Sequence, residues 1–462
     1  MEYTNLFYVL AGVLFIIGLK KLSHPKTARN GNIIASIGML IAIVATLVAF
    51  GNLDYKIIVI GMIIGAIIGS TFAIKVKMTG MPQMVAIFNG FGGGASALVA
   101  AAEFYTKVGH GEQTTFLLST IALSVLVGTL TFTGSFIAFG KLQGFISGQP
   151  IVFKGQKVLN AIIAIALITC SVMMVNNPDQ MMTYFLAVVI LSAILGITIV
   201  IPIGGADMPV VISLLNSYSG IAAAATGFVL LNNGLIISGA LVGASGLILT
   251  NIMCKGMNRS LANVIFGAVG LTQEGASGDA AGKQMNIKSY STEEAAMIFD
   301  AADKVIIVPG YGLAVAQAQH AAREVADYLE SKGKTVLYAI HPVAGRMPGH
   351  MNVLLAEANV PYEHLKDLDE INPEFETCDV ALVLGANDVV NPAARHDKSS
   401  PIYGMPILDV DKSRTVIINK RTMNPGFAGI QNELFGFDNS IMVFGDAKQM
   451  LTDLLKDLKE LA

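Results

Sequence analysis

The chain has 462 residues, which is too long for one ordinary hydrophobic core, and only 14% of them are charged, against roughly 25% in a soluble domain. Residues 1–260 contain 13 Lys and Arg against 6 Asp and Glu, whereas residues 261–462 contain 17 against 27. An acidic second part argues against nucleic-acid binding. The three cysteines lie far apart without metal-binding spacing and indicate ordinary thiols. Composition therefore predicts a membrane part followed by an acidic soluble part.

The first 260 residues contain nine apolar stretches, each near the roughly 20 residues that a bilayer core of about 30 Å requires. They are residues 4–20, 31–50, 56–76, 82–105, 114–140, 158–176, 181–203, 208–230 and 233–255. If residue 1 is outside, the inner loops carry eleven Lys and Arg and the outer loops two. This bias predicts a cytoplasmic location for the C-terminal part. Frequent glycine and alanine in the spans predict a closely packed helical bundle.

A few polar residues interrupt the apolar spans. Asn89, Asn216 and Ser245 lie within them, and Asp207 lies at the inner edge of one. An asparagine in hydrocarbon is costly unless it has a partner. Two interpretations remain open: hydrogen bonds between helices, or a water-lined path for a proton or another ion.

Residues 261–290 are predicted to form a linker, because their many glycines show no periodicity. A helix is expected to begin at Thr292, capped by Ser291 or Thr292. Residues 291–462 then alternate between short apolar runs typical of strands and longer stretches with helical periodicity. Strands are predicted at 304–308, 335–340, 363–366, 379–385, 414–420 and 440–444, and helices at 313–332, 349–359, 391–396 and 446–461. This order predicts a Rossmann-like α/β domain with an open parallel sheet.

The first predicted strand runs into a Gly-x-Gly turn at the start of a helix. The residues of this turn are candidate cofactor contacts: Gly310, Tyr311, Gly312, Leu313, Ala314 and Val315. Such turns let the backbone approach a pyrophosphate, and the helix N-terminus presents free N–H groups to it. Val315 stands in place of the third glycine. Strand–helix turns with glycine also occur without a ligand, so the turn alone does not decide the function.

The loop after the second predicted strand supplies four more candidates, which are Val343, Ala344, Gly345 and Arg346. No acid stands at the end of this strand. A carboxylate there would hold a ribose 2′-hydroxyl and favour NAD, so its absence leaves room for a 2′-phosphate. Arg346 is either a pyrophosphate clamp or a solvated loop arginine, and the sequence leaves both open.

Later loops add candidates at the ends of the remaining strands. They are Gly385, Ala386, Asn387 and Asp388; Lys420 and Arg421; Gly426, Phe427 and Ala428; and Gly445, Asp446 and Ala447. Asp388 either contacts the ribose or nicotinamide or forms an Asx turn. Adjacent Lys420 and Arg421 are suited to a 2′-phosphate, although a basic strand end is often only solvated. No metal cluster and no catalytic Cys–His pair is present in the sequence of this domain. Hydride transfer needs neither, because it requires positioning rather than an acid or base.

As a set, these motifs resemble the β subunit of the proton-translocating NAD(P)+ transhydrogenase, over nearly the whole chain. The matching stretches are residues 309–319, 341–352, 385–388, 420–421 and 445–448, and in the membrane residues 216–220. The resemblance implies NADP(H) in this chain and NAD(H) in a separate alpha subunit, with direct hydride transfer coupled to proton movement. It also implies a bacterial inner membrane with its lipid, and a higher oligomer of alpha–beta units.

The resemblance further implies roles for individual residues. Gly310, Gly312 and Arg346 would lie along the pyrophosphate, and Lys420 with Arg421 would hold the 2′-phosphate. Asp388 would link the state of the cofactor to the membrane, and Asn216 would lie on the proton path together with Asn89, Ser245 and Asp207. No residue is expected to act as a catalytic acid or base.

Two positions depart from the family pattern. Asn89 stands where some members have a histidine, so the protonation role would lie elsewhere, for example on a histidine of a partner helix. Phe427 stands where some relatives have tyrosine, which removes one hydrogen bond but keeps the ring.

Two other classes of protein fit parts of the sequence. An ion channel or transporter gated by a nucleotide-sensing α/β domain would also need binding without catalytic side chains. A membrane-anchored reductase that uses NADP would act without an alpha subunit.

Overall fold

A computed structural model of the chain describes residues 2–49, 54–77, 80–109, 114–258, 260–266, 287–347, 349–400, 402–426 and 428–461. The chain divides into two compact units. The first comprises residues up to 250, and the second comprises the residues from 287 onward, each with a short piece of the segment between them. Most of the predicted linker, residues 267–286, lies outside the described residues.

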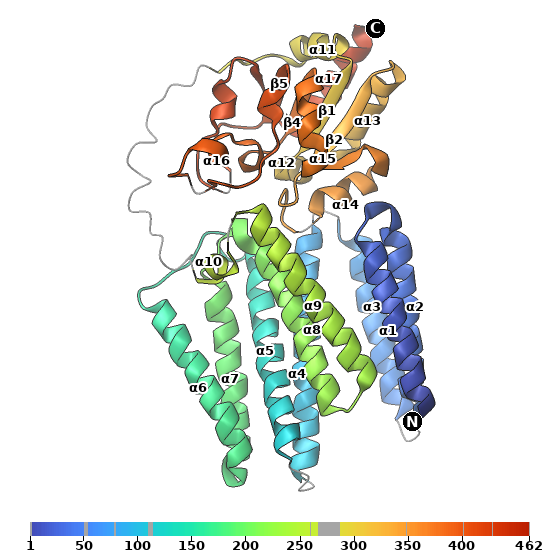
Figure 1. Cartoon of the computed structure of the whole chain (residues 1–462), viewed down its shortest axis with the longest axis vertical. Helices are drawn as coiled ribbons and strands as arrows, with labels where there is room; N and C mark the ends of the chain where they lie inside the picture. Colours follow the sequence, from blue (N-terminus) through green and yellow to red (C-terminus); the bar gives the residue numbers. More distant parts are fainter. Residues whose placement is uncertain are drawn as a thin grey trace. The chain divides into compact units, whose positions relative to one another are not determined.

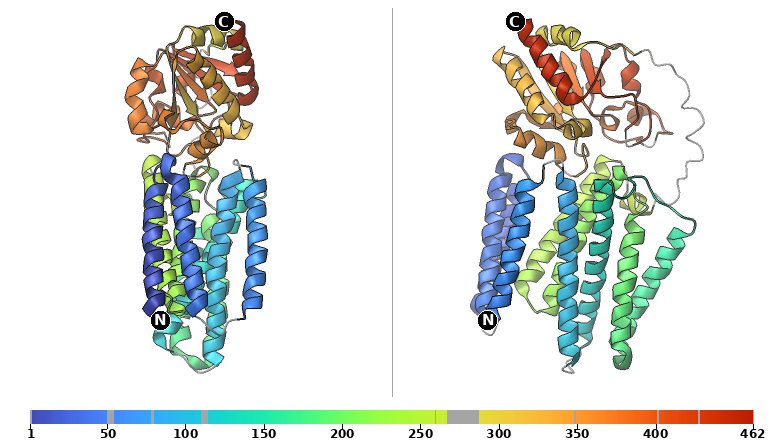
Figure 2. Two further views of the ribbon diagram at one scale, coloured as in Figure 1. Left: turned by 90° about the vertical axis from the view of Figure 1, so that its right-hand side faces the viewer. Right: turned by 180° about the vertical axis from the view of Figure 1, so that it is seen from behind.

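The first unit is a bundle of long apolar helices (Figures 1 and 2). In the described part of the chain, nine helices are long and apolar enough to cross a membrane, as predicted. They are α1 (Glu2–Leu22), α2 (Pro25–Ala49), α3 (Tyr55–Lys75), α4 (Met81–Gly109), α5 (Thr115–Gln143), α6 (Gln156–Asn176), α7 (Met181–Val200), α8 (Met208–Val229) and α9 (Asn233–Gly256). A short helix, α10 (Leu261–Phe266), begins the predicted linker.

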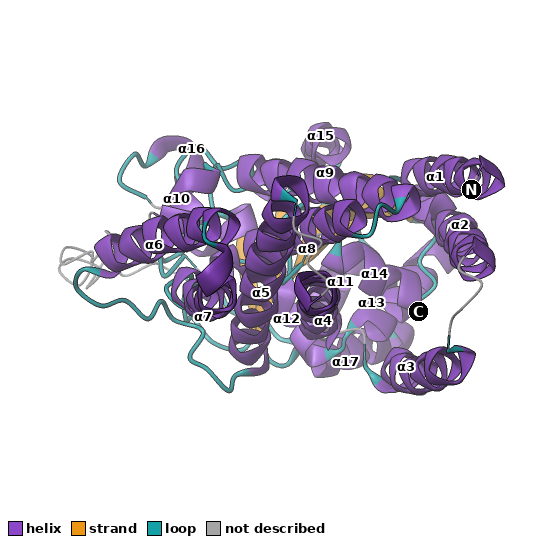
Figure 3. Cartoon of the chain, turned by 90° about the horizontal axis from the view of Figure 1, so that it is seen from below, coloured by secondary structure: helices purple, strands orange, loops and turns teal. Residues whose placement is uncertain are grey.

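Helix α8 is the most enclosed span of the bundle, and α3 is the least. In α8, 67% of the most apolar window is buried, whereas in α3 the figure is 0%. Figure 3 shows α8 among α4, α5 and α9, with α3 apart from them. The outer surface of α3 is therefore available to lipid or to another polypeptide.

Small residues bring the central helices into backbone contact. A Cβ atom added to Gly220 of α8 would lie 2.4 Å from the backbone nitrogen of Gly243 in α9. A Cβ added to Gly93 of α4 would lie 2.7 Å from Cβ of Thr131 in α5. Such separations are too short for any side chain, so these glycines permit the close helix packing that the sequence predicted. By contrast, a Cβ added to Gly61 of α3 would meet nothing within 4 Å.

The second unit is built on a six-stranded parallel sheet with the order β3-β2-β1-β4-β5-β6. The strands are β1 (Lys304–Pro309), β2 (Thr335–Ile340), β3 (Leu365–Asp367), β4 (Val380–Leu384), β5 (Thr415–Lys420) and β6 (Ser440–Phe444). All six predicted strands are confirmed within two residues. The β-branched and leucine side chains of β1 and β4 are buried, as expected for strands covered on both faces.

Helices complete this unit (Figure 1). They are α11 (Thr292–Asp300), α12 (Tyr311–Ala316), α13 (Gln319–Ser331), α14 (His350–Glu357), α15 (Leu368–Ile371), α16 (Ala393–His396) and α17 (Ala447–Glu460). Helix α11 begins with a capping box in which the Ser291 hydroxyl accepts from the N–H of Glu294 and the Glu294 carboxylate accepts from that of Ser291.

One predicted helix is divided in two. The sequence pattern predicts a single helix over 313–332, but the chain forms α12 and α13 with Gln317 between them at a φ of 52°. The N–H of Ala318 donates to the carbonyl of Leu313, which closes the end of α12. A helical hydrophobic periodicity continues through this break, so periodicity could not mark it.

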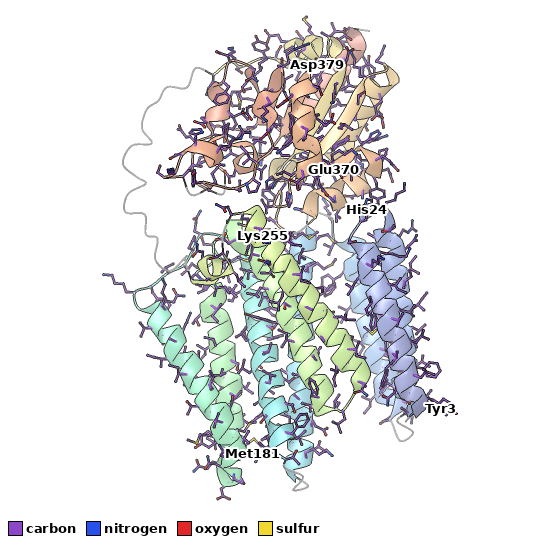
Figure 4. The ribbon with its side chains drawn as sticks, in the orientation of Figure 1. Tyr3, His24, Met181, Lys255, Glu370 and Asp379 are labelled. Carbon is purple, nitrogen blue, oxygen red and sulfur yellow. The ribbon has the colours of Figure 1, made fainter. Side chains whose placement is uncertain are left out.

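The amino ends of the two central strands are joined by Asp379, which is labelled in Figure 4. Its carboxylate accepts hydrogen bonds of 3.0 Å from the N–H groups of Asp303 and Lys304 at the start of β1. The opposite, carboxyl ends of β1 and β4 then diverge into loops. Because the strand order reverses between β1 and β4, this edge is where an open α/β sheet binds its ligand.

Candidate functional site

A cavity of about 400 Å³ lies at the carboxyl ends of β1, β4 and β5. This volume is typical of small-molecule sites. Loops after four strands line it: Gly310, Tyr311, Gly312, Ala344, Gly345, Gly385, Ala386, Asn387, Asp388, Val389, Lys420, Arg421, Thr422, Asn424, Pro425 and Gly426. The structure thus brings together twelve of the residues predicted from four separate stretches of the sequence.

The glycines of the first turn hold two loops together at the cavity wall. Gly310 N–H donates to the carbonyl of Leu384 at 2.9 Å, and Gly312 N–H donates to that of Gly385, also at 2.9 Å. A Cβ on Gly312 would lie 2.6 Å from Cα of Gly385, whose own φ is 64°. Only glycine fits this approach. The Gly312 N–H is therefore occupied within the protein rather than directed at a ligand.

Two basic side chains line the cavity at the end of β5. The Lys420 ammonium donates to Asn387 Oδ1 at 3.2 Å and to the carbonyl of Asn424 at 2.9 Å, and it lies 4.7 Å from the ring centre of Phe435. Burial lowers the pKa of Lys420, and the negative charge of Asp388 opposes that shift. Arg421 is exposed and forms no ion pair with any described residue. This guanidinium is thus available to an anion.

Asp388 connects the loop after β4 to the glycine loop after β5. Its Oδ2 accepts the N–H of Ala428 at 2.9 Å, and its Oδ1 accepts from Asn387 Nδ2 at the same distance. Gly426 packs directly on this carboxylate, since a Cβ added there would lie 2.6 Å from Oδ1. Asp388 therefore positions the glycine loop beside Lys420.

The loop after β2 is held by two buried histidines. His350 Nδ1 accepts the N–H of Arg346 at 3.1 Å, and His341 Nδ1 accepts that of Val343 at 3.2 Å. The other nitrogen of His341 lies 2.8 Å from the carbonyl of Pro406. Burial lowers the pKa of both rings to about 4, and for His350 the positive charge of Arg346 acts in the same direction. Both rings are thus neutral at pH 7, and the Nδ1 atom of each is engaged by a backbone N–H of the loop.

Arg346 stacks on the ring that follows the first glycine. Its guanidinium lies 4.5 Å from the ring centre of Tyr311. Burial raises the pKa of the Tyr311 phenol, and the charge of Arg346 opposes that shift. Arg346 is therefore a packed side chain at the rim of the cavity and not a freely solvated loop arginine.

In the membrane unit, Asn89 of α4 is 7% exposed and reaches α8, donating from Nδ2 to the carbonyl of Ile212 at 3.2 Å. Asn216 follows one helical turn later on α8 and is partly buried. Asp207, 6% exposed, stands at the N-cap of α8. Ser245 of α9 instead donates to Val242 in its own helix. Three of the four predicted path residues are thus on α8, at its N-cap or bonded to it.

The chain matches the family model of the NAD(P) transhydrogenase beta subunit over residues 4–457. The NAD(P) transhydrogenase subunit beta of Rhodospirillum rubrum is 54% identical to it over 457 residues, which cover 97% of each chain. A second sequence of that name, from a named strain of the same species, gives the same values.

The chain belongs to this family. The match spans both units, so the membrane helices and the sheet are parts of one family pattern, and the resemblance predicted from the motifs is confirmed. A transhydrogenase of this family uses NAD(P)-type nucleotides, and a beta subunit implies a partner alpha subunit. The nine apolar helices make it a multi-pass membrane protein.

Several predicted site residues of this transhydrogenase subunit lie outside the cavity lining. Leu313 and Ala314 are buried beneath the first turn, and Val315 is 45% exposed on its far side. Gly445, Asp446 and Ala447 follow β6, where the Asp446 carboxylate caps α17. Val343, Arg346 and Ala428 are also outside the lining, although they lie in loops that contribute to it. Phe427 lies outside the described residues.

The structure also adds residues to the cavity that the sequence did not single out. Val389, Thr422, Asn424 and Pro425 line it. Three of them, Thr422, Asn424 and Pro425, lie between the basic pair and Gly426. Their position in that loop was the only feature of the sequence that could have indicated a place in the cavity lining. Their side chains carry no distinctive chemistry, which is why residue type alone could not select them.

Proposed function

We propose that this chain is the NADP(H)-binding, proton-conducting subunit of a transhydrogenase that exchanges hydride with NAD(H) on an alpha subunit. The observation that carries the NADP assignment is the pair Lys420 and Arg421 at one end of the cavity, together with the absence of an acid after β2. A 2′-phosphate needs cationic donors, and Arg can hold it with two parallel hydrogen bonds. A ribose 2′-hydroxyl would instead need a carboxylate at the end of β2.

The remaining lining residues fit the rest of a dinucleotide by their position. The turn at Gly310 and Gly312 would lie along the pyrophosphate with Arg346 at the rim, and Asn387 and Asp388 would face the ribose or the nicotinamide. The bound cofactor supplies a carbon that accepts or donates a hydride. The protein residues bind, orient and exclude water. Hydride transfer between two nicotinamide carbons needs no proton transfer at the reacting carbon.

Coupling requires two states of the membrane unit that differ in their affinity for the oxidised or reduced cofactor. Asn89, Asn216, Asp207 and Ser245 are our candidates for the proton path. An asparagine does not titrate near pH 7, so the titrating group lies elsewhere, and a histidine of a partner helix would serve.

The remaining assignments complete the proposed subunit. We assign residues 1–260 to proton translocation, 261–290 to a linker and 291–462 to NADP(H) binding. The subunit would lie in a bacterial inner membrane, surrounded by lipid, with its C-terminal domain in the cytoplasm and as part of a higher oligomer of alpha–beta units. The positive charge of the inner loops supports this orientation.

Hydride transfer tests the proposal directly. Membranes that contain this chain and its alpha partner should transfer hydride from NADH to an NADP+ analogue, and membranes that lack the partner should not. Transfer without the partner would indicate a membrane-anchored reductase. Nucleotide-dependent ion flux without any hydride transfer would indicate a gated channel.

A further inference from the structure

A buried lysine outside the candidate site closes the end of α5. Lys141 is one of the eleven Lys and Arg that the sequence assigns to the inner loops. The structure instead places it in the last turn of α5, where only 5% of its surface is exposed. Burial of an ammonium is costly unless its donors are bonded. The position therefore requires a specific set of acceptors.

Those acceptors are two backbone carbonyls from different connections. Lys141 Nζ donates to Gln149 at 3.1 Å, in the connection between α5 and α6, and to Ile203 at 2.8 Å, in the connection between α7 and α8. Within the described residues, no carboxylate pairs with this ammonium. The negative end of the α5 dipole favours a cation at this place. Lys141 is thus a cross-link between two connections and not a member of an ion pair.

Backbone contacts support the same junction. Gly205 N–H donates to the carbonyl of Gly148 at 2.9 Å, and Gly204 packs against Pro150. The connection between α7 and α8 is therefore laid against the one between α5 and α6, with Lys141 bonded to both.

The second of these connections leads directly into α8. Only Gly204 and the 3₁₀ turn Gly205–Asp207 separate Ile203 from the first residue of α8, and the first turns of α8 are fully buried. Ile212, whose carbonyl accepts from Asn89, lies in this buried part. A shift of the Ile203 carbonyl would therefore move the end of α8 that begins at Asp207 and includes Ile212, the partner of Asn89.

We propose that Lys141 is a positioning residue for α8, holding the α7–α8 connection in place so that hydride transfer stays coupled to proton movement. This inference rests on the proposed function. A lysine that only contributes positive charge to the inner face would place no demand on hydrogen-bond geometry, and its replacement by another residue would leave coupling unchanged.

The test compares two reactions of the complete complex in membranes. Net NADPH formation from NADH requires proton movement under the proposal. Exchange of hydride between NADH and an oxidised NAD analogue, through NADP(H) that stays bound and returns to its starting state, requires none. Lys141→Met should lower the coupled reaction at least tenfold and change the exchange reaction by less than twofold. Lys141→Arg, which keeps the charge and the donors, should restore a large part of the coupled rate.

The matched control is Lys154→Met, since Lys154 is exposed in the same α5–α6 connection. It should match the wild type in both reactions. Hydrogen–deuterium exchange supplies a second readout: Lys141→Met should speed exchange in peptides covering 201–209 and leave α1 and α2 unchanged. Coupled rates within twofold of wild type in Lys141→Met, or an equal loss in both reactions, would overturn the inference. Absence of coupling in the wild type would instead overturn the proposed function itself.

Discussion

Glycine brings backbones together in both units of this transhydrogenase subunit, but the contacts serve different structures. In the sheet unit, Gly312 and Gly385 join two loops, and those loops form the wall of a cavity. In the membrane unit, Gly220 and Gly243 join two whole helices. Loops can carry many polar groups to one cavity, whereas the packed helices place few polar side chains between them, such as Asn89 and the hydrogen-bonded pair Ser124 and Thr226.

The difference predicts that binding and coupling can be altered separately. Substitutions at the carboxyl edge of the sheet should change the affinity for NADP(H). Substitutions among the central helices should change proton-coupled turnover and leave that affinity unchanged. The predictions below test this division, and the first of them carries the largest expected effect.

Removal of the basic pair should produce the largest loss. Lys420→Ala with Arg421→Ala should weaken NADP(H) binding by about 100-fold or more, because each charge-assisted hydrogen bond contributes roughly 1.5–3 kcal/mol. Equilibrium binding to the full chain measures this. The matched control is Lys412→Ala with Arg414→Ala, which removes the same charges at the opposite end of β5. Unchanged NADP affinity in the first double variant would remove the 2′-phosphate assignment.

Glycine substitutions should separate the units in stability. Gly385 has a φ of 64°, and a Cβ added there would clash with the backbone of Gly312. Gly385→Ala should therefore destabilise the sheet unit by roughly 2–4 kcal/mol and abolish NADP(H) binding. Gly333 also has a positive φ, of 81°, but a Cβ added there would meet nothing within 4 Å. Gly333→Ala therefore measures the cost of the backbone strain without the steric clash. Hydrogen–deuterium exchange in peptides of the sheet unit measures the loss of stability in both variants. Equal losses in the two variants would show that the close approach at Gly385 is unimportant.

The corresponding membrane pair is Gly220→Ala and Gly61→Ala. The first places a Cβ 2.4 Å from the backbone of α9, and the second places it in open space. Gly220→Ala should reduce the yield of folded complex and its coupled activity several-fold, whereas Gly61→Ala should match the wild type. A harmless Gly220→Ala would contradict the tight packing of α8 on α9.

Asn216→Leu should act on coupling alone. It removes a polar side chain from α8 without touching the sheet unit, so proton-coupled turnover should fall about tenfold, which corresponds to roughly 1.4 kcal/mol of barrier. NADP(H) affinity should not change. Asn233→Leu, at an exposed position at the start of α9, is the control. Full coupled activity in Asn216→Leu would make Asn216 a packing residue.

The last prediction concerns the effect of pH on stability. His341 and His350 have pKa values lowered to about 4 in the folded chain, against 6.5 ordinarily. As the pH falls from about 6.5 toward 4, the unfolded chain binds protons that the folded chain does not, so stability decreases, by at most about 1.4 kcal/mol per pH unit for each histidine. The midpoint of heat inactivation of NADP(H) binding should fall over this range. In His350→Gln it should start lower and depend less on pH; an identical slope would contradict the buried neutral ring.

Much of the fold could be predicted because each unit has a strong local signal. The spans are long and almost free of charge, and the strands are short apolar runs, three of which (β1, β4 and β6) lead into glycine, so both sets of elements lie close to their predicted bounds. The break at Gln317 could not be predicted, because it depends on a left-handed residue within a continuous apolar pattern. The burial of Lys141 could not be predicted either, since it depends on carbonyls that are remote in sequence.

The gathering of candidate residues at one cavity was predictable where residue type matched strand position. Gly310, Asp388 and the basic pair follow strands that lie side by side in the sheet, which is why they meet. The contact of Arg346 with Tyr311 depends on two loops that adjacent strands bring together, and no spacing in the sequence encodes it. The hydrogen bond from Asn89 to Ile212 could not be predicted from the sequence either, because it depends on how α4 packs against α8.

The most direct test of the proposed function is to follow proton movement and hydride transfer together in sealed vesicles that contain the complex. Oxidation of NADPH by an NAD+ analogue should change the internal pH in proportion to the hydride transferred, and vesicles without the alpha partner should show neither signal. Hydride transfer with no change in internal pH, or ion flux on NADP(H) binding alone, would contradict a proton-conducting transhydrogenase subunit.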